Sequence, residues 1–276
     1  MLGAGLASAA LLAACGSGGA APAAKPQQSG SAELLASSYQ KLQDARSADM
    51  TLAETVRTAN GTEALSLSAS GAFHWSQLYG SMDMKIDVPS SGASLTMKEI
   101  LSGPDEYVSV PSTRAGAPRW IEISLSQFEA AGSSQGMNPS QTLQLLQERA
   151  VSLTDLGPAT IDGVATTHYR AELSLTSGVK PSLRTFMADY ERLSGAKTIP
   201  VDIWIDGGGL PRRVEIAETL KHSPVASAAA AAAFPLHVTV TMDFSHYGVE
   251  VAAPTVPTSG VERLPASVLS RFFGGA

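Results

Sequence analysis

Residues 65–75 read Leu-Ser-Leu-Ser-Ala-Ser-Gly-Ala-Phe-His-Trp. Apolar or small side chains fill every odd-numbered position, and polar or small ones fill the positions between. Because successive side chains of a β-strand point to opposite faces of a sheet, this period of two predicts a strand with one buried and one exposed face. The fold should therefore be built on a sheet that is covered on one side and hydrated on the other.

The same period of two continues on both sides of this stretch. Residues 50–56 alternate in the same way and lead to Asn60-Gly61, a dipeptide typical of hairpin turns. Residues 82–88 alternate after it. Further strands are expected over 95–101, 106–110, 119–125, 153–161, 166–175, 201–206, 210–220 and 236–244. Over residues 50–125, short connections rich in turn residues predict consecutive antiparallel hairpins that form a long meander.

Three segments have helical spacing instead. Residues 32–46 carry an apolar stripe that predicts an amphipathic helix, and Asn138-Pro139 opens a second one through Ala150. Pro181 opens the third, which Gly195 ends. The sequence thus predicts an α+β protein, an antiparallel sheet of about nine to eleven strands with a few helices on its apolar face.

Composition excludes several classes of function. The chain has 276 residues, 19 Lys and Arg against 25 Asp and Glu, and a net charge of −6. No run of basic residues exists, which argues against nucleic acid as a partner. Cys15 is the only cysteine, so neither a disulfide nor a cysteine-based metal site can be built within the chain.

The N-terminal region resembles that of a bacterial lipoprotein. Leu12-Ala13-Ala14-Cys15 closes an apolar run and resembles a lipobox, in which the cysteine sulfur receives a diacylglyceryl group and the preceding peptide is removed. Residues 1–14 contain no Lys or Arg, whereas secretory signals begin with a basic segment. We therefore expect that segment to lie upstream of residue 1. The alternative is an uncleaved Ala-rich tail whose cysteine is a small hydrophobic residue.

Four parts of the chain follow from these patterns. Residues 1–14 are expected to be a lipoprotein-type signal peptide, and residues 15–31 the lipidated Cys15 with a flexible Gly/Ser/Ala/Pro linker. Residues 32–256 should form one folded domain, and residues 257–276 a C-terminal tail that is either a short docked helix or loose. Residues 224–233, Pro, Ser and a run of alanines, are expected to be a low-complexity insertion in a hairpin loop.

Three motifs carry a family resemblance. Residues 162–170, Asp-Gly-Val-Ala-Thr-Thr-His-Tyr-Arg, resemble a strand of the LppX/LprG family of actinobacterial lipoproteins. Residues 201–213, with Trp204, Asp206 and Pro211-Arg212-Arg213, resemble a hairpin of that family, and residues 243–254 are similar to its closing strand. The resemblance covers residues 32–256 and implies a LolA-like half-barrel, a strongly curved sheet with helices covering its concave side. The motifs themselves look structural rather than catalytic.

The same resemblance implies an apolar cavity between sheet and helices that holds the acyl chains of lipids or glycolipids. Methionine is frequent on the expected inner face, and its flexible side chain suits irregular or ligand-holding surfaces. Ala69 and Gly71 should widen the space. For any single residue, ordinary core packing is the alternative. The candidate lining residues are Met50, Leu52, Leu65, Leu67, Phe73, Met82, Met84, Ile86, Met97, Phe186, Met187 and Tyr190.

No catalytic, cofactor or metal site is expected. Residues 132–136 fit G-x-S-x-G but lack the strand and helix that a nucleophile elbow needs. The five histidines show no metal-ligand spacing, and His168 is expected on the outer face of its strand. Asp202 and Asp206 are explained by turn and strand-edge positions.

Two hypotheses of function follow. The leading one is a monomeric envelope lipoprotein, exported and held by Cys15 on the outer face of the cell membrane, that binds or carries lipid or glycolipid acyl chains. The alternative is a structural or sensory interaction module, the same half-barrel with a packed interior and a protein partner. An enzyme is a distant third, because no cluster of His and carboxylates is suggested by the spacing.

Overall fold

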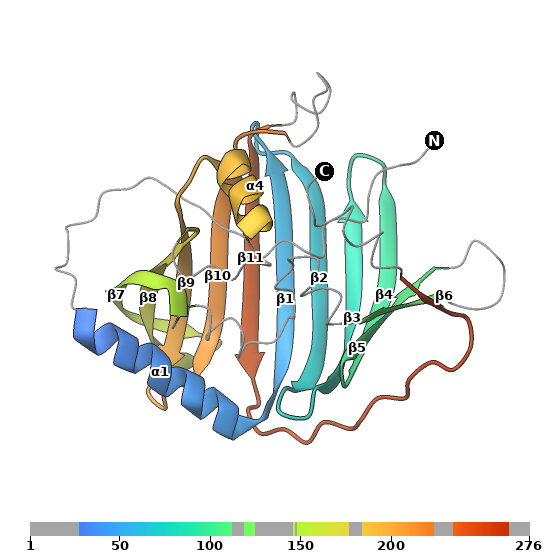
Figure 1. Ribbon diagram of the computed structural model, residues 1–276, viewed down its shortest axis with the longest axis horizontal. Helices are drawn as coiled ribbons and strands as arrows, with labels where there is room; N and C mark the ends of the chain where they lie inside the picture. Colours follow the sequence, from blue (N-terminus) through green and yellow to red (C-terminus); the bar gives the residue numbers. More distant parts are fainter. Residues whose placement is uncertain are drawn as a thin grey trace.

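A computed structural model describes residues 28–111, 119–124, 146, 148–176, 184–223 and 234–264. Within these residues twelve strands form a single open sheet, and helices α1 and α4 lie on one face of it (Figure 1). The predicted α+β class and the curved, helix-covered sheet are confirmed. The elements are α1 (Gln28–Ala45), β1 (Ser47–Thr58), β2 (Glu63–His74), β3 (Tyr79–Val88), β4 (Ala93–Ser102), β5 (Asp105–Val110), β6 (Arg119–Ser124), β7 (Ala150–Ile161), β8 (Val164–Ser174), α4 (Arg184–Ser194), β9 (Thr198–Asp206), β10 (Pro211–Leu220), β11 (Leu236–Ser245) and β12 (Val261–Arg263).

The strand order is β12-β6-β5-β4-β3-β2-β1-β11-β10-β9-β8-β7. Two meanders, β1–β6 and β7–β11, therefore meet where β1 pairs with β11, from Asp49↔Ser245 to Thr58↔Leu236. The meander predicted over residues 50–125 is confirmed by β1–β6, whereas the pairing of β1 with β11 was not predicted. Turn residues encode pairing between consecutive strands, whereas the β1–β11 pair joins segments that are far apart in the chain.

The twelfth strand lies in the segment predicted to be a C-terminal tail. Residues 261–263 pair in parallel with residues 120–122 of β6. Three residues are too few to show an alternation, so this strand could not be predicted from sequence. At the other end of the domain, α1 begins at Gln28, four residues before the predicted start at residue 32.

The alternation that predicted the strands matches the observed faces. Across β2 and β3 the inner pairs are Leu67↔Ile86, Ala69↔Met84 and Gly71↔Met82. Ser68, Ser70, Asp83 and Lys85, one position along, are exposed. Burial of the apolar face is the main stabilising term, at about 25 cal/mol per Å² of apolar surface.

Gly71 is required where β2 and β3 come closest. A Cβ on Gly71 would lie 2.0 Å from the main-chain oxygen of Ser81 and 2.7 Å from the Cα of Met82. The prediction that Gly71 widens the interior is therefore wrong, because the main chain of β3 already fills that space. The residue instead allows two adjacent strands of a curved sheet to approach closely.

Helix α1 is fixed to the sheet by both apolar and polar contacts. Leu35 and Leu42 are buried in the same hydrophobic cluster as the inner face of the sheet. The indole N–H of Trp75 donates a hydrogen bond to the main-chain oxygen of Leu42 at 3.1 Å. The helix ends at Ala45, and the next residue, Arg46, has a φ of 64° that reverses the chain into β1.

Helix α4 covers the other end of the same face. Met187 and Tyr190 are buried against the sheet. Gly195, with a φ of 69°, ends the helix as predicted, and the main-chain N–H groups of Lys221 and His222 donate to the oxygen of Leu193. Three predicted features lie outside the described residues: the helix start at Pro181, the insertion at 224–233, and nearly all of the helix expected from Asn138 to Ala150. Ala150 itself begins β7.

Candidate functional site

Eleven of the twelve predicted lining residues belong to one hydrophobic cluster. Leu52 and Leu65 are partly buried, and the side chain of Phe186 lies outside the described residues. The other nine are buried: Met50, Leu67, Phe73, Met82, Met84, Ile86, Met97, Met187 and Tyr190. The alternation thus identified which side chains meet, since residues of one phase on every strand share a face.

Two different regions make up this inner face. In Figure 1, α1 crosses the lower ends of β9 and β10, and α4 lies over the upper ends of β10 and β11. Neither described helix lies over β3–β5. Met82, Met84 and Met97, which we call the methionine patch, are nonetheless buried there, and Met84 is the direct cross-strand neighbour of Met97. This half of the face therefore contains three flexible, polarisable side chains.

Four glutamates also lie on the inner face, and none of them was predicted from the sequence to be a site residue. Three of them come two positions after an inward-facing apolar residue, and so face inward as well. These are Glu54 after Leu52, Glu218 after Ile216 and Glu99 after Met97. Glu106 faces inward from β5. The signal was present: a carboxylate in an inward phase of an alternating strand is a buried ionisable group, which is costly unless paired or protonated.

Glu218 has one hydrogen-bond partner and one unpaired oxygen. It is 4% exposed, and its Oε2 accepts a hydrogen bond of 2.6 Å from the hydroxyl of Tyr190 on α4. Its Oε1 is buried and has no partner among the described residues. Burial raises the pKa of Glu218 to about 9, against the opposing effect of the Tyr190 hydrogen bond, and the charge of Glu54 adds to the increase. Glu218 is therefore neutral at pH 7.

Glu54 lies on the other side of β11 from Glu218. It is opposite Val240, whereas Glu218 is opposite Val238, so both carboxyl groups are on the same face. Glu54 is 5% exposed, and its Oε1 has no partner in the described part of the chain. Burial raises the pKa of Glu54 to about 7. We call Glu54 and Glu218 the carboxyl pair.

A second acidic pair lies at the far side of the methionine patch. Glu99 is opposite Val108, and Glu106 is opposite Leu101, so the two glutamates are diagonal neighbours on β4 and β5. Burial raises the pKa of Glu99 well above its usual value, and the charge of Glu106 adds to this. Glu106 is partly exposed as a residue, but burial raises the pKa of its carboxyl group to about 7.

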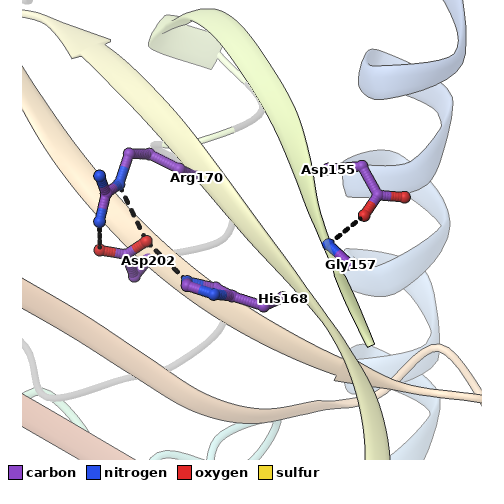
Figure 2. Close-up of polar contacts among 5 residues, drawn as sticks. All are labelled: Asp155, Gly157, His168, Arg170 and Asp202. Carbon is purple, nitrogen blue, oxygen red and sulfur yellow. Dashed lines mark hydrogen bonds and ion pairs between the residues drawn. The ribbon is translucent and has the colours of Figure 1, made fainter. Parts of the chain in front are cut away.

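The outer face carries a polar cluster in which both carboxylate oxygens of Asp202 have partners. Figure 2 shows Arg170 and His168 both pointing toward Asp202. Arg170 donates from Nε and Nη2 at 3.0 and 2.8 Å, and His168 Nε2 lies 2.7 Å from Oδ1 of Asp202. His168 also stacks on Trp204 at 4.1 Å. The outward position predicted for His168 is confirmed, and Asp202 lies within the interior strand β9 rather than at a sheet edge.

Two other acidic residues serve turns and bulges. Asp206 accepts hydrogen bonds from the main chain of Gly208 and Leu210 at 2.8 and 3.0 Å, which is the predicted turn role. Asp155 accepts from the main-chain N–H of Gly157 at 2.7 Å, at the β-bulge of β7 (Figure 2). Within the described ranges no group of three or more His, Cys, Asp or Glu side chains could hold a metal ion. No described helix has the length and apolar character needed to span a bilayer.

The fold and its inner face define a class, an α+β protein with an open antiparallel sheet whose apolar concave face carries helices. No protein-family model matches the chain, and no curated protein matches it. It is similar to LprF from Mycobacterium bovis, with a TM-score of 0.45, 12% identity, and coverage of 84% of this chain and 99% of that chain. It is also similar to the lipoprotein LppX from Mycobacterium tuberculosis, with a TM-score of 0.45, 15% identity, and coverage of 80% and 98%.

A LolA-superfamily protein from Nitrosomonas europaea is similar over 85% of this chain and 96% of its own, with 13% identity and a TM-score of 0.24. LppX gives its name to the family that the sequence motifs resemble. With TM-scores below 0.5, these similarities carry no information on what this chain binds.

Proposed function

We propose that this protein binds lipid acyl chains against the inner face of its sheet and acts as a carrier or holder of lipid. The observation that supports this most directly is the methionine patch together with the rest of the apolar face. Strands β1–β4 and β7–β11 contribute buried apolar side chains to one hydrophobic cluster, and both described helices lie over one half of the sheet. An acyl chain that leaves water for such apolar surroundings gains about 25 cal/mol per Å² of its own surface buried.

The proposed mechanism is sequestration without chemistry. Apolar burial drives uptake, and the polar outer face, with Arg170, Asp202 and His168, keeps the loaded protein hydrated. No covalent step is required of any residue. The proposal rests on the residues of this chain.

We further propose that the protein is exported and held at the outer face of the cell membrane by acyl groups on Cys15. The residue lies outside the described part of the structure, and its assignment rests on the Leu12–Cys15 motif and the Gly/Ser/Ala/Pro linker after it. Two or more acyl chains give stable anchoring, whereas one gives only reversible binding. The linker would then set how far the folded body reaches from the membrane.

Native mass spectrometry of the folded body, together with titration of the fluorescent apolar probe N-phenyl-1-naphthylamine, tests the lipid-binding proposal. We expect co-purifying lipid and saturable binding of the probe. Met84→Asp should weaken probe binding, because it places a charge in the methionine patch, whereas Asp83→Asn on the exposed face should not. Absence of both bound lipid and saturable probe binding would contradict the proposal.

The packed interaction module is the second candidate, and one observation favours it. Met187 and Tyr190 of α4 are buried directly against the sheet, so side chains from a helix fill part of the concave face. If such packing extends over the whole face, no acyl chain can enter. The probe titration distinguishes the two, because a packed half-barrel that recognises a protein partner would not take up the probe.

A further inference from the structure

The two side chains of the carboxyl pair are surrounded by apolar residues on the inner face of the sheet. On β1, Glu54 lies between Leu52 and Val56 in the inward phase. On β10, Glu218 lies between Ile216 and Leu220 in the same phase. Strand β11 separates them, with Val238 and Val240 facing inward between the two carboxyl groups.

The register sets the separation of the two glutamates. Adjacent strands lie about 4.8 Å apart, so β1 and β10 are about 10 Å apart across the intervening strand. The two residues are also displaced along the strands by two positions of β11, which is about 7 Å. Their side chains can converge over Val238 and Val240 without a direct bond. A small polar group placed between them could contact both.

Each member of the pair has a buried oxygen without a partner. Tyr190 occupies Oε2 of Glu218, which leaves Oε1 of Glu218 and Oε1 of Glu54 unpaired among the described residues. The two residues are 4% and 5% exposed, so water does not reach these oxygens freely. Buried polar groups nearly always have a partner, and an exception calls for a physical explanation.

The protonation states indicate what that partner would be. Burial raises the pKa of Glu218 to about 9, so the neutral acid carries a proton that the unpaired Oε1 can donate. Burial raises the pKa of Glu54 to about 7, so near neutral pH its carboxyl group is a strong acceptor in a large fraction of molecules. An alcohol both accepts and donates a hydrogen bond. It can therefore satisfy Glu218 and Glu54 together, whereas an ammonium group can only donate.

We propose that Glu54 and Glu218 form a hydroxyl-binding site within the apolar inner face, which makes the protein selective for lipids that carry a hydroxyl group. This deepens the proposed lipid binding and rests on it. Apolar contact would hold the chain, and the carboxyl pair would set its position along the sheet. Tyr190 is a positioning residue, because it fixes Glu218 from α4 and leaves one carboxyl oxygen free.

The test uses displacement of N-phenyl-1-naphthylamine by two matched lipids, 1-tetradecanol and its methyl ether. The ether keeps the chain and an acceptor oxygen but lacks the donor. We expect the alcohol to displace the probe at a concentration about tenfold lower than the ether, a ratio equivalent to one hydrogen bond to a charged or buried group. Glu54→Leu should remove this difference and keep probe binding, because leucine extends the apolar face.

The matched control is Glu215→Leu, which makes the same substitution on the outer phase of β10. The control should keep the preference for the alcohol. Equal displacement by alcohol and ether in the unchanged protein overturns the site while leaving lipid binding intact, and so does a preference that survives Glu54→Leu. Stronger displacement by tetradecylamine than by the alcohol indicates a cation site and also overturns it. Absence of probe binding by the unchanged protein contradicts lipid binding itself, and the hydroxyl site with it.

Discussion

The hydroxyl of Tyr190 on helix α4 donates a 2.6 Å hydrogen bond to Glu218 on strand β10, inside a mainly apolar layer. This contact joins the covering helix to the sheet through a carboxyl group that is neutral at pH 7. It links the stability of the fold to pH, and it places a polar group where an acyl chain would lie. Three predictions concern the stability of the fold, and a fourth concerns its attachment to a membrane.

Replacing Glu218 with Gln should stabilise the protein at alkaline pH. The folded-state pKa of about 9 exceeds the usual value of 4.5, so the stabilising effect of the neutral acid is complete below pH 4.5. It decreases as the pH rises from there to about 9. The variant cannot ionise and should be more stable than the unchanged protein by roughly 2–4 kcal/mol at pH 8, and nearly equal at pH 4.5. Urea unfolding at both pH values measures this difference. Glu215→Gln, on the outer face, is the control and should show no such pH-dependent gain.

Tyr190→Phe should loosen α4. The variant leaves Oε2 of Glu218 buried without its donor, which costs about 1–3 kcal/mol. Hydrogen exchange over residues 184–194 should become faster, because this helix would open more often. Tyr79→Phe removes a hydroxyl from a partly exposed position on β3 and should leave the exchange of α4 unchanged. Unaltered protection of α4 in Tyr190→Phe would show that this hydrogen bond does not hold the helix.

Gly71→Ala should destabilise the sheet at the β2–β3 pair. The added Cβ would lie 2.0 Å from the main-chain oxygen of Ser81, so one of two adjacent strands must move. We expect a loss of about 2–4 kcal/mol in the free energy of unfolding. Gly207→Ala is the control, because a Cβ there meets no atom within 4 Å. Equal thermal stability of the two variants would contradict the close approach of β2 and β3.

Cys15→Ser should release the folded body from the membrane while leaving lipid binding unchanged. The sulfur is the expected attachment point of the anchor, and serine cannot form the thioether. Fractionation of cells followed by probe titration of the released protein measures both effects. A Cys15→Ser protein that still sediments with membranes would show that the lipobox interpretation is wrong.

The strands and their faces could be predicted from sequence because a β-strand repeats every two residues. The alternation within residues 65–75 and 82–88 predicted which side chains face inward, including Leu67, Met82 and Met84. The helix before residue 46 and the end of α4 at Gly195 followed from spacing and cap chemistry, which are also local. These features depend on residues within a few positions of one another.

The pairing of distant segments could not be predicted in this way. Strand β1 lies beside β11, and β12 adds to β6, although many residues separate the members of each pair. Gly71 is small because of Ser81 on the neighbouring strand, and not because of any space that it leaves open. No local period specifies such neighbours, since they depend on which edges meet when the two meanders come together.

The sequence by itself thus determined the sheet, its apolar face, the helical cap chemistry and the resemblance to a lipoprotein leader. Only the tertiary structure brought Glu54 and Glu218 to the two sides of β11 and placed Tyr190 above them. The physical reason is that in-and-out alternation is a property of one strand, whereas the surroundings of a buried carboxyl group are formed by several elements. The pKa of each glutamate, and what it can bind, depend on those surroundings.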